Sequence, residues 1–193
     1  MSNPRRTATR WLRAGQIIFS VACTLLAPAA RAQVDEYAVK AAFLYKFGFF
    51  VEWPDSAFPS PVSPVNLCIV GEDPFGKSLD AVVASAQIKG RNVVIRRLQT
   101  VGRNPSCHIL YVGGSVEQSK AQIIETVRGS NVLTVSDGRG SNANDAIINF
   151  VVADKRVRFD IDDEAAAENN MLISSQLLSL ALNVKRRTSK EER

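Results

Sequence analysis

The chain has 193 residues, of which 46% are hydrophobic and 22% are charged, and its 24 Lys and Arg residues outnumber its 19 Asp and Glu residues. This length suits one domain with a sizeable hydrophobic core. His108 is the only histidine, which excludes a multi-histidine metal site and leaves one residue for any nucleophile–histidine pair.

The first 32 residues have the organisation of a secretory signal peptide. Four arginines and no acidic residue occupy the start, namely Arg5, Arg6, Arg10 and Arg13. An apolar run from Ala14 follows and closes on Ala30-Arg31-Ala32, an A-x-A cleavage pattern. We therefore predict a signal peptide over residues 1–32, cleavage between Ala32 and Gln33, and export from the cytoplasm.

Two other export signals are weaker at this terminus. Arg5-Arg6 resembles a twin-arginine start, but the residues after it do not extend the match. Cys23 could carry a lipid, yet apolar residues continue beyond it as in an ordinary signal peptide. No other stretch approaches the roughly 20 apolar residues that a membrane-spanning helix needs, so we expect no membrane insertion after cleavage.

Cleavage would change both the charge and the number of cysteines. Residues 1–32 hold five arginines and no acid, so 19 basic and 19 acidic residues remain, and nothing argues for binding nucleic acid. Cys23 leaves with the signal peptide, and two cysteines remain. In an oxidising compartment the simplest prediction is a disulfide between Cys68 and Cys107.

Residues 35–53 are predicted to form the first helix. One apolar face follows from the i, i+4, i+8, i+11 spacing of Val39, Phe43, Phe47 and Phe50. The other side is hardly polar, so we expect the helix to be buried or to form half of an interface, and a homodimer stays open. Trp53-Pro54 is expected to end the helix, because a residue before proline avoids the helical conformation.

Strands and helices then alternate. The predicted strands cover residues 65–70, 91–98, 107–112, 132–135, 147–152 and 156–161. The predicted helices cover residues 75–86, 116–128 and 173–184. This order indicates an α/β fold: a single-domain sandwich with a mixed, flavodoxin/Rossmann-like sheet, helices on both faces and a C-terminal antiparallel hairpin. We expect the domain over residues 33–184, followed by a charged C-terminal tail over residues 185–193.

The two cysteines agree with this topology. In the flavodoxin-like strand order 2-1-3-4-5 the first and third strands are neighbours, and these two strands carry Cys68 and Cys107. The link from Thr100 to Ser106 is too short for a crossover helix, so the direction of the 91–98 strand stays open. The 156–161 strand alternates polar and apolar residues, which is typical of a half-exposed antiparallel edge.

Residues Gly71 to Ser78, GEDPFGKS, match the phosphate-loop pattern G-x-x-x-x-G-K-[ST] between a predicted strand and a predicted helix. A P-loop nucleotide hydrolase is therefore one interpretation. It is the weaker one, because Pro74 has no N–H to offer a phosphate, and Glu72 and Asp73 would place two carboxylates beside it. Export would also separate the protein from ATP and GTP. A turn at Asp73-Pro74 that starts the next helix explains the same residues.

The other polar candidates form no catalytic constellation. His108 lies in an apolar strand beside Cys107, where a hydrogen-bonded core histidine is the simpler interpretation. Residues 137–145 are polar and glycine-rich but lack the spacing of a calcium loop, with Arg139 where an acid is needed. We therefore predict no metal, no cofactor and no enzymatic activity.

Several short motifs, in order along the chain, resemble the YfiR family of bacterial periplasmic proteins. They are YAVKAAFLY from Tyr37, FVEWP from Phe50, GEDPFG from Gly71, CHIL from Cys107, VLTVSD from Val132, INF from Ile148 and RFDI from Arg158. Together they span nearly the whole chain after the signal peptide.

The resemblance implies a regulatory function. Proteins of this family bind the periplasmic sensor region of a membrane-anchored diguanylate cyclase, repress cyclic di-GMP synthesis and thereby limit biofilm formation. Redox state and envelope stress are linked to release of this repression. A periplasmic protein that binds or senses a small molecule is the alternative from another class.

The resemblance also implies roles for particular residues. The family's disulfide falls on Cys68 and Cys107. Some members have a second cysteine pair, which is replaced here by Gly, Ser and Asn. A redox switch that depends on this second pair is therefore not expected here. The cyclase-facing patch carries over to Ile148, Phe150, Asp160 and Ala166. Unpaired strand edges and exposed apolar residues invite partners, so the half-exposed last strand fits such a patch independently.

Overall fold

A computed structural model describes residues 28–138 and 146–187, which divide between two units, residues 1–35 and 36–193. Helix α1 (Pro28–Phe47) begins in the first unit, and the strands lie in the second. Most of the predicted signal peptide falls outside the described residues, and its cleavage point after Ala32 falls within α1, so cleavage stays a prediction. None of the described helices has the length and apolarity needed to cross a bilayer.

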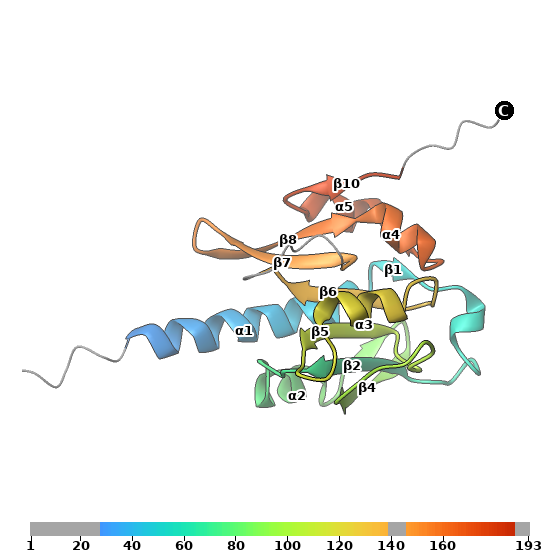
Figure 1. Cartoon of the computed structure of the whole chain (residues 1–193), viewed down its shortest axis with the longest axis horizontal. Helices are drawn as coiled ribbons and strands as arrows, with labels where there is room; N and C mark the ends of the chain where they lie inside the picture. Colours follow the sequence, from blue (N-terminus) through green and yellow to red (C-terminus); the bar gives the residue numbers. More distant parts are fainter. Residues whose placement is uncertain (1–27, 139–145, 188–193) are drawn as a thin grey trace, which may run out of the picture. The chain divides into compact units, whose positions relative to one another are not determined.

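The second unit contains an eight-stranded sheet with the order β10-β8-β7-β6-β5-β2-β4-β3 (Figure 1). Five strands run parallel: β2 (Val65–Gly71), β4 (Arg91–Leu98), β5 (Ile109–Gly114), β6 (Leu133–Asp137) and β7 (Ile148–Ala153). The antiparallel neighbours are β8 (Arg156–Asp162) beside β7 and β3 (Gln87–Ile88) beside β4. The short strand β10 (Val184–Lys185) runs parallel to β8.

The parallel strands confirm the predicted 2-1-3-4-5 order. The strand over 91–98, whose direction the sequence left open, is parallel to β2 because helix α2 (Lys77–Val83) carries the chain across between them. The chain then returns past β2 to β5 without a helix. Helix α3 (Lys120–Thr126) connects β5 to β6.

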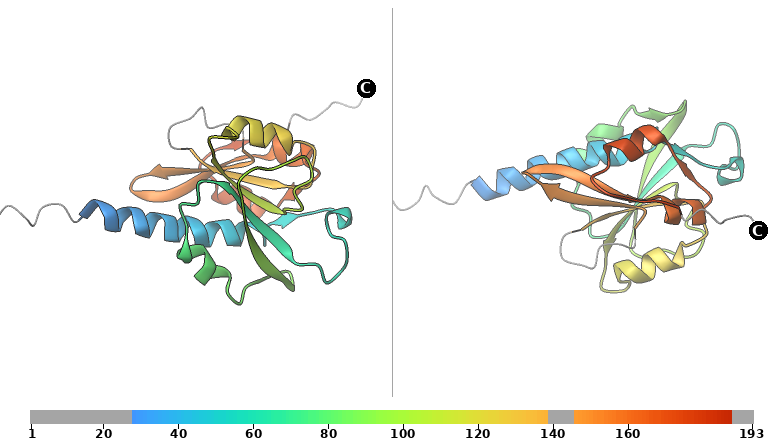
Figure 2. Two further views of the ribbon diagram at one scale, coloured as in Figure 1. Left: turned by 60° about the horizontal axis from the view of Figure 1, so that its bottom comes forward. Right: turned by 90° about the horizontal axis from the view of Figure 1, so that it is seen from above.

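Two apolar cores lie on the two faces of the sheet. The larger core contains the inward residues of β2, β5, β6, β7 and β8 together with α1, α2 and α5 (Ser175–Leu180). The smaller core packs α3 against the other face and includes Cys68 and Cys107. Figure 2 shows the part of α1 that belongs to the second unit, residues 36–47, and α3 on opposite sides of the strands, so the prediction of helices on both faces is confirmed.

The first helix ends at Phe47, six residues before the predicted end, and its buried face is rotated. Beyond it, Val51–Glu52 form strand β1, which pairs antiparallel with β9 (Leu172–Ile173), a partner more than a hundred residues later in the chain. A short 3-10 helix, η1 (Asp55–Ala57), follows. Lys40 is fully buried, whereas Val39, predicted to face the core, is 45% exposed.

The C-terminal region is more divided than the sequence predicted. The expected helix over 173–184 is only α5, placed between β9 and β10, and an additional helix, α4 (Asp163–Glu168), precedes it. Asp162 caps α4, because its Oδ1 accepts a hydrogen bond from the Ala165 N–H at 2.9 Å. An aspartate followed by the acidic, alanine-rich run DEAAAE is the signal that could have identified this helix.

Strand β8 has the predicted alternation, with Phe159 and Ile161 buried and Arg156 and Arg158 exposed. It forms a hairpin with β7 through Asp154 and Lys155, both in the left-handed backbone region that a two-residue turn requires. The prediction that β8 is an edge strand is correct for its first half alone. From Phe159 onward, the chain around β10 pairs with it.

Candidate partner-binding site

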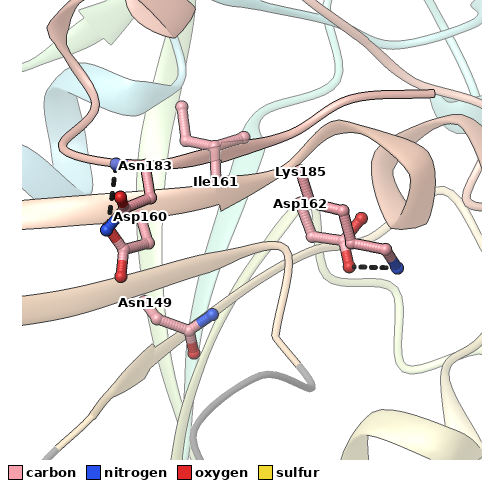
Figure 3. A pocket seen from close by; sticks show the side chains of 6 residues that line it. All are labelled: Asn149, Asp160, Ile161, Asp162, Asn183 and Lys185. Carbon is pink, nitrogen blue, oxygen red and sulfur yellow. Dashed lines mark hydrogen bonds and ion pairs between the residues drawn. The ribbon is translucent and has the colours of Figure 1, made fainter.

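A hollow of about 480 Å³ lies over β7, β8 and β10 (Figure 3). Its lining residues are Asn149, Asp160, Ile161, Asp162, Asn183 and Lys185. Asn149 and Asp160 are directly opposite each other in the β7–β8 pairing. Because side chains alternate along a strand, these two point away from the larger core, into which their neighbours Ile148 and Phe159 point.

Asp160 is held in place by one residue. Its Oδ1 accepts hydrogen bonds from the backbone N–H of Asn183 at 3.0 Å and from the Asn183 side chain at 2.9 Å (Figure 3). Within the described ranges, its second oxygen, Oδ2, accepts no hydrogen bond. The carboxylate is thus fixed in position while keeping one oxygen available to a donor from outside the chain.

The floor of the hollow is polar and internally bonded. Asn149 is largely buried, and its side chain accepts a hydrogen bond from the Ser136 hydroxyl at 2.6 Å and donates one to the Ala146 carbonyl at 2.8 Å. An asparagine with both ends engaged keeps a single orientation. The floor therefore gives the hollow a defined shape and hydrogen-bonding pattern.

Ion pairs join the rim to the chain that follows α5. Lys185 lies 3.0 Å from Asp162 and 3.1 Å from Glu164, and these contacts raise the pKa of its ammonium. Arg187 makes two hydrogen bonds to the Asp163 carboxylate, at 2.9 and 3.0 Å. Lys185 and Arg187 of the predicted charged tail are thus attached to β8 and α4.

The four residues that the resemblance assigned to a partner do not share one surface. Ile148, Phe150 and Ala166 are completely buried in the larger core, and the Phe150 ring stacks on Phe47 with centroids 5.7 Å apart. Asp160 is half-buried and lines the hollow. A partner could touch Asp160 directly, and the other three could influence it only by shaping the sheet beneath.

Of the six lining residues, only Asp160 was predicted from the sequence. The other five are Asn149, Ile161, Asp162, Asn183 and Lys185. Side chains alternate along β7, so Ile148 points into the larger core and Asn149 faces the hollow. Lys185 was taken for part of a solvated tail, because a two-residue strand such as β10 leaves no periodic pattern. The pairing with β8 depends on residues more than twenty positions apart.

Cys68 and Cys107 are joined by a disulfide, with their Cα atoms 5.8 Å apart. Both residues are buried in the smaller core, which covers the same face of the sheet as the hollow. Four strand spacings separate β2 from β8, or roughly 19 Å at about 4.8 Å each. Any effect of the disulfide on the hollow must therefore pass through the sheet.

The GEDPFGKS segment folds as a closed turn. The Asp73 carboxylate accepts hydrogen bonds from the N–H groups of Phe75 and Gly76, at 2.8 and 3.1 Å, and from Arg97 at 2.7 Å. Burial alone would raise the pKa of Asp73, but these hydrogen bonds outweigh it and the pKa lies below its ordinary value. The donors that a phosphate would need are taken by Asp73, and Lys77 points to solvent.

His108 is a hydrogen-bonded core residue. Its Nδ1 accepts the backbone N–H of Asn66 at 3.0 Å, so the proton lies on Nε2, which donates to the Ala57 carbonyl at 3.1 Å. Its ring stacks on Phe58 with centroids 4.3 Å apart. Both nitrogens are engaged, and burial lowers the pKa of the imidazole.

Elsewhere in the described ranges, no three side chains among His, Cys, Asp and Glu come together as a metal site would need. The polar loop over 139–145, considered above as a calcium loop, lies outside the described residues.

A family model described as YfiR/HmsC-like matches residues 37–182, well over half of the chain. Among curated proteins no match was found.

Proposed function

Because the chain belongs to the YfiR/HmsC-like family, we propose that it is a periplasmic regulator that binds the periplasmic region of an inner-membrane diguanylate cyclase and represses cyclic di-GMP synthesis. The activity is repression by contact and involves no catalysis. The family assignment supports the regulatory class. The identity of the partner and the periplasmic location are parts of the proposal.

The observation that carries the proposal is the fixed Asp160 carboxylate in the hollow over β7, β8 and β10. A charged acceptor that is already oriented loses little freedom on binding, and hydrogen bonds to charged groups are stronger than neutral ones. A donor from the cyclase, such as an arginine or lysine, would suit the unused Oδ2. Asn149 and Asn183, on either side of Asp160, also line the hollow.

The test is co-purification of the cyclase from envelope extracts with the tagged protein. Asp160→Lys reverses the charge at the centre of the hollow and is expected to abolish co-purification and to raise cyclic di-GMP in cells. Asp160→Asn keeps an oxygen for Asn183 but removes the charge, and is expected to weaken binding by roughly tenfold to hundredfold.

Asp80→Lys is the matched control, because it makes the same charge change on α2, near the opposite end of the sheet. It is expected to leave co-purification unchanged. If Asp160→Lys retains the cyclase as well as Asp80→Lys does, the hollow is not the binding site. If deletion of the protein leaves cyclic di-GMP unchanged while the cyclase is present, the regulatory proposal itself is wrong.

A further inference from the structure

A second, smaller cavity of about 140 Å³ opens at the carboxyl ends of β2, β5 and β6. Its walls come from α1, the segment that follows β2, the ends of β5 and β6, and the start of α3. The lining residues are Tyr37, Glu72, Pro74, Tyr111, Gly113, Lys120 and Asp137. Pockets for drug-sized ligands hold about 300–1,000 Å³, so this cavity is suited to a much smaller molecule.

The cavity lies where the topology of the sheet reverses. From β2 the chain crosses to β4 through α2, whose Leu79 packs in the larger core, whereas from β5 it crosses to β6 through α3, whose Ile123 packs in the smaller core on the other face. The two connections diverge between the neighbouring strands β2 and β5. In open α/β sheets, ligands bind in the crevice that forms at the carboxyl ends of strands at such a point.

The backbones of the two strands come together closely beneath this cavity. The Glu72 N–H donates to the Gly114 carbonyl at 3.0 Å. A Cβ atom at Gly113 would lie 2.2 Å from the Glu72 carbonyl oxygen, so only glycine fits there. The contact fixes Glu72 at the mouth of the cavity.

Tyr111 supplies the observation that points to a ligand. Its side chain lines the cavity, the residue is only 3% exposed, and its ring packs edge-on against Phe75 with centroids 4.6 Å apart. Its hydroxyl has no hydrogen-bond partner among the residues that the structure describes. Because this hydroxyl is open to the cavity, a ligand there can supply the partner that buried tyrosine hydroxyls normally have.

The charges around this hydroxyl are mainly negative. Burial, followed by the negative field of Asp137 and then by Tyr37, Glu72 and Asp73, raises the pKa of Tyr111 well above its ordinary value. The phenol therefore stays neutral and can accept a hydrogen bond. Two cations lie near these charges, and both are engaged. Lys40 contacts the Asp137 carboxylate and lies over the Tyr37 ring, 4.8 Å from its centroid, and Lys120 donates to the Asp137 backbone carbonyl at 3.1 Å.

We propose that this cavity binds a small organic cation, a primary ammonium, through the Tyr111 hydroxyl and the Glu72 carboxylate. An ammonium has three donors and no acceptor, which matches a site of oxygen acceptors. Aromatic rings with carboxylates are also the usual surroundings of bound organic cations. The inference does not depend on the proposed cyclase partner.

The test is isothermal titration of the protein with butylammonium chloride, with sodium chloride at the same ionic strength as the reference and sodium acetate as the anionic probe. Saturable binding of butylammonium is expected. Glu72→Gln and Tyr111→Phe are each expected to weaken it by roughly tenfold to hundredfold. Tyr45→Phe is the matched control, because the Tyr45 hydroxyl bonds the Gln87 carbonyl outside the cavity, and it should not change the affinity.

Because the Tyr111 hydroxyl has no partner to lose, Tyr111→Phe is also expected to melt at the same temperature as the wild-type protein when no amine is present. The proposal is overturned if butylammonium does not saturate, or if it binds equally well to Tyr111→Phe. Saturation by acetate that is lost in Lys120→Met would show a site for anions and would likewise overturn it.

Discussion

The ammonium group of Lys40 contacts the Asp137 carboxylate inside the protein, and the structure leaves Lys40 with no exposed surface. Glu36 completes the arrangement at 2.7 Å from the same ammonium. Removing one partner of a buried ion pair leaves the other charge uncompensated in a poorly solvating environment. This pair ties α1 to the end of β6, and Asp137 also lines the small cavity.

Lys40→Met is therefore expected to lower the free energy of unfolding by about 3–5 kcal/mol. Lys46→Met, at an exposed position of the same helix, is the control and should change it by less than about 0.5 kcal/mol. Urea unfolding followed by circular dichroism measures both. Equal stability of the two variants would mean that the buried pair contributes nothing to folding.

The disulfide is expected to contribute strongly to stability. Cys68 and Cys107 are 39 residues apart, for which the chain-entropy model gives about 4 kcal/mol. The double variant Cys68→Ala/Cys107→Ala should lose about this much in denaturant unfolding. A reductant should lower the melting temperature of the wild-type protein and leave the double variant unaffected. If the reductant shifts both proteins equally, its effect does not act through this bond.

His108 predicts a loss of stability in mild acid. Burial lowers the pKa of the folded-state imidazole, the hydrogen bond to Ala57 opposes this, and Arg91 adds to it. The unfolded chain therefore binds the proton more readily, so the contribution is fully present above the ordinary pKa of about 6.5 and is lost as the pH falls through the folded-state pKa. Since it is the only histidine, its NMR titration can be assigned without ambiguity.

The midpoint of that titration is expected below 6.5. The variant His108→Phe should remove the dependence of unfolding free energy on pH between about 5 and 7, because no other imidazole is present. A folded-state midpoint above 6.5, or a pH dependence that persists in the variant, would contradict the assignment of the proton to Nε2 alone.

The turn at Asp73 provides a test of the phosphate-loop interpretation. Asp73→Ala removes hydrogen bonds to two backbone N–H groups and the pair with Arg97, and should cost about 1–2 kcal/mol of stability. Lys77→Ala should change stability by less than about 0.5 kcal/mol and should not alter the response to ATP or GTP. A melting temperature that rises with ATP in the wild-type protein and not in Lys77→Ala would restore the nucleotide interpretation.

The central strands were predictable because the hydrophobic pattern of each strand's own residues indicates a strand. Runs such as LCIV in β2 and ILYV in β5 are apolar on both faces, as strands covered on both sides must be. The strand order followed from two cysteines and from the spacing of the alternating elements. Residues within each element determine these features, so one sequence is sufficient to predict them.

What the sequence did not predict depends on partners far along the chain. Lys40 occupies a core position because Asp137, 97 residues later, neutralises it, and a count of apolar residues treats lysine as exposed. The first helix ends at Phe47, and Val51 beyond it pairs with Ile173. The hollow around Asp160 likewise needs Asn183 and β10. None of these contacts leaves a periodic signal in the local sequence.

The crosslink between Cys68 and Cys107 also determines how the molecule would respond to a mechanical load. A pull on the two ends of the chain passes through the covalent bond and bypasses the segment that it encloses. Fully extended, that segment would be about 130 Å long at about 3.4 Å per residue. Stretching the chain cannot extend it while the disulfide is intact. Helix α2 and strands β3 and β4 lie inside this loop, so they are shielded from tension that would draw out β7 and β8.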